Sequence, residues 1–106
     1  MIIVTSETIA NKRIVKTLGL VRGNTVRARH IGKDIMAGLR NIVGGEVHEY
    51  AKLIAESREQ TIDRMVAEAE SLGANAILTT RFTTSVMMGG AAELLAVGTA
   101  VVVEDA

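Results

Sequence analysis

The sequence predicts one α+β domain of 106 residues in which β-strands lie before and after a long helix. Apolar residues recur every three to four positions between Gly45 and Gly73, which is typical of an amphipathic helix. The residues before and after this segment form runs rich in β-branched side chains, bounded by glycines. The last two runs are close enough in sequence to pair as an antiparallel hairpin.

The first part of the chain predicts three strands. Ile2 to Val4 reads as a short strand, and Lys12 to Val21 as a longer one. Gly19 within the second strand indicates a bulge or a close backbone approach. Gly23-Asn24 predicts a turn or a bulge. Thr25 to His30 alternates apolar and basic residues, so we expect a half-buried strand with a basic outer face.

Two helices are expected next. Lys33 to Val43 has apolar residues at helical spacing and predicts a short helix that ends at Gly44-Gly45. The long helix over Gly45 to Gly73 follows at once, and Gly73 suits a left-handed C-terminal residue. Its apolar row consists of Val47, Tyr50, Ala51, Ile54, Thr61, Ile62, Met65, Ala69 and Leu72. Arg58 is the one charged residue in that row.

Two strands complete the chain. Ala76 to Val86 alternates, and strict alternation would put Ala76, Leu78, Thr80, Phe82 and Thr84 on one face and Ile77, Thr79, Arg81 and Thr83 on the other. Neither face is apolar throughout, which favours an interface position for part of this strand. Met87 to Ala92 is an uncharged connector, and Leu94 to Val103 is the most apolar strand.

Composition predicts self-association. Hydrophobic residues make up 48% of the chain, with one Tyr, one Phe and no Trp, so the apolar residues are nearly all aliphatic or Met. A short chain has little interior, so this excess of aliphatic surface favours a homo-oligomer whose subunit contacts finish burying it. An unusually aliphatic monomer is the alternative.

The sequence also excludes several classes of protein. It contains no cysteine, and therefore no disulfide, thiolate metal site or cysteine nucleophile. The N-terminus lacks the features of a signal peptide, and no apolar run approaches the roughly 20 residues of a membrane span. We therefore expect a cytoplasmic protein with no membrane partner.

Charge is unevenly distributed. Residues 1–45 carry eight basic and two acidic side chains, whereas residues 46–106 carry four basic and ten acidic ones. The halves could face each other within or between subunits, or the basic half could contact nucleic acid. Because no aromatic stacking residues accompany the basic ones, the first explanation is favoured over nucleic-acid binding.

Several motifs together resemble a known family. They are Gly19-x-Val21-x-Gly23, Arg40-x-x-Val43-Gly44-Gly45-Glu46, Tyr50, Arg58, Gly73-Ala74-Asn75-Ala76 and Gly98-Thr99-Ala100-Val101. Their order over nearly the whole chain resembles the YbjQ-like family of small bacterial and archaeal proteins. The resemblance implies an α+β subunit with an antiparallel sheet against one short and one long helix, assembled as a ring, a homopentamer. The family is catalogued as heavy-metal-binding and has no established activity.

The sequence offers few metal ligands. A soft-metal site needs thiolate, thioether or imidazole groups that converge. His30 and His48 are far apart in sequence and show no ligand spacing. His48 with Glu49, or the pair Met87-Met88, could supply ligands across a subunit boundary. Met side chains in an apolar segment are more often packing residues.

Two arginines are candidate polar-site residues. Arg58 lies in the apolar row of the long helix and should be at least partly shielded, with Glu46 or Glu93 as its partner inside the subunit or across a subunit boundary. A structural ion pair is the simpler role for Arg58, and anion recognition is the alternative. Arg81 lies among threonines, which suggests either a polar cavity or an exposed side chain.

No residue pattern predicts catalysis. The serines have no basic partner at a motif spacing, and the paired carboxylates fall on the solvated helix face. We therefore expect a protein that binds or scaffolds and is not an enzyme. The alternative is a carrier of a metal ion or small anion with sites at subunit contacts.

Overall fold

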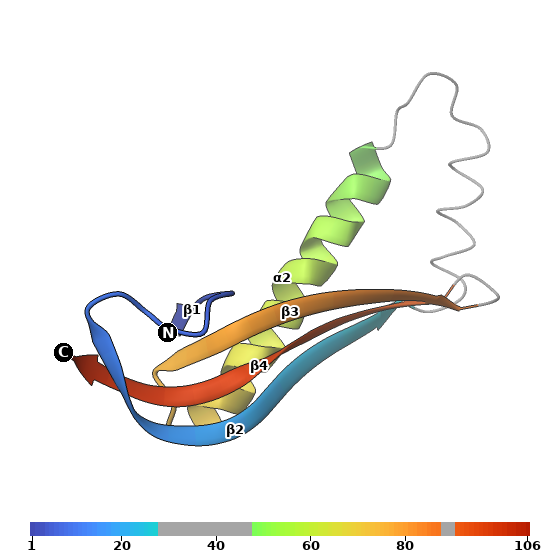
Figure 1. Cartoon of the computed structure of the whole chain (residues 1–106). Coiled ribbons are helices and arrows are strands. Elements are labelled where there is room, and N and C mark those ends of the chain that lie inside the picture. The colour runs from blue at the N-terminus through green and yellow to red at the C-terminus, as the bar shows by residue number, and fades with distance from the viewer. Residues whose placement is uncertain (28–47, 88–90) are drawn as a thin grey trace.

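A computed structural model describes residues 1–27, 48–87 and 91–106. These residues form an α+β fold with one four-stranded sheet in the order β1-β3-β4-β2 and one helix, α2 (Figure 1). The elements are β1 (Ile2–Ile3), β2 (Lys12–Arg27), α2 (His48–Ser71), β3 (Ala76–Met87) and β4 (Ala91–Asp105). The short helix expected over Lys33 to Val43 lies outside the described residues.

The sheet is mixed. β4 pairs antiparallel with both β2 and β3, and the hairpin expected for the last two strands is confirmed. β1, however, pairs parallel with the start of β3, so the expectation of a wholly antiparallel sheet is wrong. The backbone N–H of Ile2 donates to Asn75 O at 3.1 Å and that of Val4 to Ile77 O at 3.0 Å. The N-terminal segment thus runs alongside the start of β3, in the same direction.

α2 confirms the long helix. Its buried residues Ser57, Thr61, Met65 and Ala69 recur every four positions and form the stripe that faces the sheet. Gly73 has a φ of 88°, and its N–H donates to Glu70 O at 3.0 Å, as expected for a glycine that ends a helix. No helix in the described part of the chain is both long and apolar enough to cross a membrane.

β2 is one continuous strand, so the turn or bulge predicted at Gly23-Asn24 is wrong. Gly23 and Asn24 stay in register with Ala96 and Leu95 of β4. A Cβ on Gly23 would lie 2.3 Å from Thr61 O, so the glycine lets α2 approach the strand backbone. The irregularity predicted at Gly19 is confirmed: the register shifts there, and Gly19 has a φ of 118°.

β3 contains a bulge that changes which residues share a face. Leu78 pairs with Thr99, but the next pair is Arg81 with Val97, so two residues of β3 oppose one of β4. Thr79, within the bulge, has a φ of 55°. As a result Leu78 and Phe82 lie on opposite faces, and the strict alternation predicted for this strand fails after Leu78.

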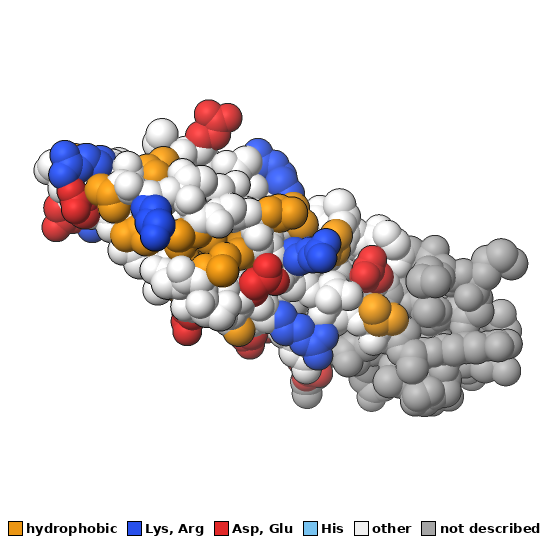
Figure 2. Space-filling view, turned by 90° about the horizontal axis from the view of Figure 1, so that it is seen from below, with side chains coloured by type: hydrophobic (Ala, Val, Ile, Leu, Met, Phe, Trp, Pro, Cys, Tyr) orange, Lys and Arg blue, Asp and Glu red, His pale blue; other side chains and the backbone are white. Residues whose placement is uncertain are grey.

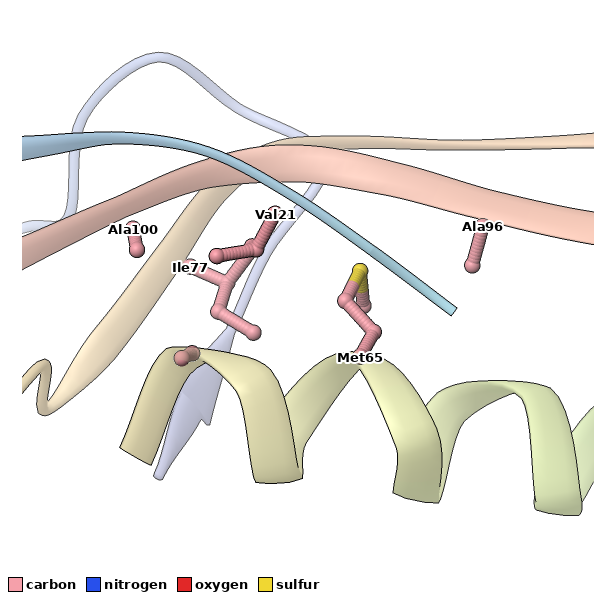
Figure 3. Close-up of a cluster of buried hydrophobic side chains, with 6 residues drawn as sticks. Val21, Met65, Ile77, Ala96 and Ala100 are labelled. Carbon is pink, nitrogen blue, oxygen red and sulfur yellow. The ribbon is translucent and has the colours of Figure 1, made fainter. Parts of the chain in front are cut away.

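Two apolar clusters hold the fold together. Between the sheet and α2, Val21, Ile77 and Ala96 point toward Met65 (Figure 3). Ala69 and Ala100 complete this cluster. On the other face of the sheet, a second cluster of Ala76, Leu78, Val101 and Val103 is covered by Ile2, Val4 and Ile9 from the N-terminal segment.

Candidate functional site

Among the described residues, the N-terminal segment covers one end of the sheet face that points away from α2. Side chains alternate along a strand, and Val21, Gly23 and Thr25 of β2 are buried toward the helix. Their neighbours therefore point the other way. Beyond the cover given by the N-terminal segment, the residues on this side, here called the open face, are Leu20, Arg22, Asn24, Val26, Arg81, Thr83, Ser85, Glu93, Leu95, Val97 and Thr99.

The open face is apolar in its middle and along its β2 edge. Leu20 is 66% exposed and Val26 is 57% exposed, while Leu95 and Val97 of β4 are half-buried. In the space-filling view, exposed hydrophobic side chains lie among Lys, Arg, Asp and Glu side chains over the described part of the molecule (Figure 2). A mixture of aliphatic and basic side chains is typical of a contact surface for another molecule.

Two arginines lie in one row across the open face. Val97 of β4 pairs with Arg22 on one side and with Arg81 on the other. Two strand spacings separate these arginines, which places their Cα atoms about 10 Å apart. Arg81 Nη1 donates to the carbonyl oxygens of Thr5 at 3.0 Å and Thr80 at 2.9 Å. Within the described residues, neither arginine forms an ion pair.

The ion pairs of the described residues lie near the ends of β2 and β4. Lys12 pairs with Asp105, and Arg13 with Glu104. The hydrogen bond and positive charge of Lys12 lower the pKa of the exposed Asp105 carboxyl. These pairs tie the two strand ends together, and neither Arg22 nor Arg81 has a carboxylate partner in the part of the chain that the structure describes.

The structure separates the residues predicted to meet Arg58. Arg58 is exposed on α2, so the prediction of a shielded arginine is wrong. Glu93 lies on the open face, where Asn24 Nδ2 donates to its Oε2 at 3.2 Å. Glu46 lies outside the described residues. Arg81 is exposed, and no described residue places it in an enclosed polar cavity.

A buried hydroxyl network joins α2 to β2 and was missed by the sequence analysis. Thr25 Oγ1 lies 3.0 Å from Thr61 Oγ1, and Thr61 Oγ1 donates to Ser57 O at 2.7 Å. Arg64 Nη1 donates to Asn24 O at 2.6 Å beside this network. The sequence held one sign of this network: Thr61, a polar residue, stands in the apolar row of the helix and therefore needs a hydrogen-bond partner when it is buried.

Metal ligands do not gather in the described residues. No group of three or more His, Asp or Glu side chains there is placed to hold an ion. His30 and Met88 lie outside the described residues. His48, Glu49 and Met87 are placed only as parts of α2 and β3, and their side chains are not described. The described residues therefore supply no ligand set that fits a heavy metal.

In its described part, this is a small α+β protein with α2 packed on one face of the sheet and with exposed apolar and basic side chains on the other. Residues 1–104 match a family described as "putative heavy-metal-binding", the YbjQ family, and the chain belongs to it. The prediction of family from the sequence motifs is confirmed.

Relatives support the same assignment. A UPF0145 protein of Methanosarcina acetivorans is 59% identical over 101 residues, which cover 95% of each chain. A UPF0145 protein of Dehalococcoides mccartyi is 57% identical over 98% of this chain and all of the relative. A crystal structure of a protein of unknown function from Pediococcus pentosaceus, described as a member of the DUF74 family, aligns with a TM-score of 0.64 over 98% of both chains at 14% identity. That likeness supports the fold alone.

Proposed function

We propose that this protein is a homo-oligomer, a closed ring of five copies, that binds or scaffolds without catalysis. The observation that carries the proposal is the open face of the sheet. Leu20 and Val26 are large aliphatic residues on ordered strands, yet 66% and 57% of their surfaces remain exposed. Leu20 and Val26 lie at the two ends of the half-buried pair Leu95 and Val97, and exposed apolar residues grouped in this way on a small chain are typical of an interaction site.

The energetics favour covering this face. Removal of apolar surface from water contributes about 25 cal/mol per Å², so burying a leucine or valine contributes roughly 1.5–3 kcal/mol. A chain of 106 residues has a limited interior of its own. Contact between copies would bury the open face without a further domain, and the family resemblance is the reason for the number five.

The buried polar groups support a structural role for the core. The hydroxyls of Thr25 and Thr61 bond to each other and toward Ser57 O, so they join the helix to the strand. These hydroxyls are buried in the core, and their hydrogen bonds go to each other and to a backbone carbonyl. A role in binding or scaffolding uses the surface of this fold and leaves the core intact.

Native mass spectrometry of the full chain in ammonium acetate tests the proposal, together with sedimentation velocity over a dilution series. We expect one dominant species at five times the 11.3 kDa chain mass. A closed ring of fewer than five copies would support the ring and correct the proposed number of subunits. A chain that remains monomeric at micromolar and higher concentrations would overturn the proposal.

Metal-ion binding at subunit contacts is a second candidate, favoured by the description of the family. Its ligands would be His48 and Glu49. The same spectrometer tests it after loading with Zn²⁺ or Cu²⁺ and exchange into ammonium acetate. An ion retained by the wild-type chain and lost in His48→Ala would support the candidate. An ion-free assembly after loading would overturn it.

A further inference from the structure

The outer side of α2 carries a row of unpaired carboxylates. Glu56, Asp63 and Glu70 follow one another at intervals of seven residues, and Glu59 lies beside them. All four are exposed, and seven residues make two helical turns, so they share the side opposite the buried stripe. Within the described residues none of them forms an ion pair. We call these four residues the acidic stripe.

The acidic stripe and the open face cannot meet within one chain. α2 packs on one side of the sheet, and the stripe is on the side of α2 that faces away from it. Arg22 and Arg81 lie on the opposite side of the sheet from α2. The two surfaces are therefore the two outer sides of a two-layer subunit (Figure 1).

The two arginines of the open face and the acidic stripe are complementary in sign and in spacing, while Glu93, the acidic residue of that face, lies four residues along β4 from the arginine row and accepts a hydrogen bond from Asn24. The open face carries Arg22 and Arg81 with Cα atoms about 10 Å apart across the strands. Residues seven apart in a helix are about 10.5 Å apart along its axis. A helix that crosses the strands could therefore place Asp63 and either Glu56 or Glu70 against both arginines at once, with half-buried Ile62 beside the aliphatic residues.

We infer that the open face is occupied by the outer side of α2 from a second copy of this chain, with Arg22 and Arg81 against its acidic stripe. The inference rests on the proposed self-association and adds the two surfaces that make it. Such a contact joins two different surfaces, so each copy can bind one neighbour on either side. A repeated contact of this kind closes a ring when the rotation between copies allows it.

Charge exchange in the full chain tests this pairing. The variants are Arg22→Glu, Asp63→Lys and the double variant R22E/D63K. In an assembly of identical copies, the double variant restores opposite charges across every contact. Lys16→Glu is the matched control, because Lys16 is an exposed basic residue of β2 outside the Arg22–Val97–Arg81 row. Far-UV circular dichroism verifies that each variant folds.

Sedimentation velocity over a dilution series gives the association constant of each variant. We expect R22E and D63K each to weaken association by roughly a hundredfold, because like charges then meet across the contact. The double variant should regain most of this loss, whereas Lys16→Glu should change association less than about threefold. Arg22 and Asp63 are on opposite sides of one subunit, so rescue would identify contact between copies.

The remaining outcomes separate the two proposals. A wild-type chain that stays monomeric would overturn self-association and this inference with it. A wild-type oligomer in which R22E behaves like Lys16→Glu would overturn only the inference, because the open face would then have another occupant. Loss in both single variants without rescue in the double variant would likewise exclude direct pairing.

Discussion

The two faces of the sheet differ in how closely another element of the described chain approaches them. Toward α2, the paired strands β2 and β4 present the small residues Gly23, Ala96 and Ala100 alongside Val21 and Leu94, so the helix approaches the backbone of β2 closely. On the open face the same strands present Leu20 and Leu95, among other large aliphatic and basic residues. The comparison shows that the covered face is fitted to a partner in its own chain. The open face bears large apolar groups for which the described part of the chain supplies no cover.

The sharpest test of this contrast compares a large residue from each side. Met65 is fully buried between α2 and the sheet, whereas Leu20 is 66% exposed. Met65→Ala should lower the free energy of unfolding by about 3–4 kcal/mol through lost packing and a residual cavity. Leu20→Ala should change the stability of the single subunit by less than about 0.5 kcal/mol. Urea denaturation monitored by circular dichroism measures both.

Sedimentation adds a second measurement, the strength of self-association, to the comparison of Met65→Ala with Leu20→Ala. If Leu20 contacts another copy, Leu20→Ala should weaken association in sedimentation even though the subunit remains folded. Unfolding must then be compared at one fixed protein concentration, because association stabilises the folded chain. A loss of several kcal/mol for Leu20→Ala in a dissociated subunit would mean that its own chain covers Leu20, and the contrast between faces would fail.

Gly23 tests how closely the covered face fits the helix. An added Cβ would lie 2.3 Å from Thr61 O and 2.5 Å from Met65 N, and both are backbone atoms. Because α2 would have to move as a unit, Gly23→Ala should cost about 3 kcal/mol, at the upper end for an overpacked core. Thermal and urea unfolding measure the change.

Gly98→Ala is the matched control for this prediction. Its added Cβ would meet Ile77 Cγ2, a side-chain methyl, at 2.5 Å, and the nearest backbone atom, Leu78 O, lies at 3.2 Å, so one side chain would have to shift and not a helix backbone. We expect a smaller loss, about 1–2 kcal/mol. Equal losses at both positions would show that backbone contact with α2 is not what distinguishes Gly23.

The sequence predicted the helix and the strands better than it predicted how they pair and pack. The long helix and the last two strands follow from residue spacing and alternation, which are local properties. Gly23-Asn24 has the composition of a turn, but the close approach of α2 requires glycine there, and that approach depends on residues almost 40 positions away. The parallel pairing of β1 also depends on a distant partner.

The candidate site was only partly visible in the sequence for the same reason. Arg81 was selected from its threonine neighbours, but Arg22 was not, because the two arginines meet in one row only through Val97 of β4. Within one chain Arg58 and Glu93 lie on different layers and cannot pair, and a pairing between copies stays a prediction. Charge counts along the chain showed an imbalance and gave no positions in space.

The bulge in β3 determines which side chains reach each face, and Thr79 gives the smallest of the expected effects. Thr79 has a φ of 55°, a conformation that a β-branched residue adopts at a cost of about 1–3 kcal/mol. Glycine adopts it without that strain but loses about 0.5–1 kcal/mol more in chain entropy on folding. Thr79→Gly should therefore stabilise the subunit by about 1 kcal/mol, which would raise Tm by about 4–8 °C.

Thr83→Gly is the control for the bulge, because Thr83 lies in regular register with Leu95 on the same strand. Without strain to relieve, that substitution should destabilise the subunit by about 1 kcal/mol. If Thr79→Gly raises the free energy of unfolding and Thr83→Gly lowers it, the backbone at Thr79 is strained, and the rest of the fold holds the bulge despite that strain. Scanning calorimetry at one protein concentration measures both, and a loss of stability in Thr79→Gly would mean that contacts of the Thr79 side chain outweigh the strain. The bulge determines that Arg81 pairs with Val97 and therefore lies on the open face. In that case the side-chain contacts of Thr79 would be what holds Arg81 in this position.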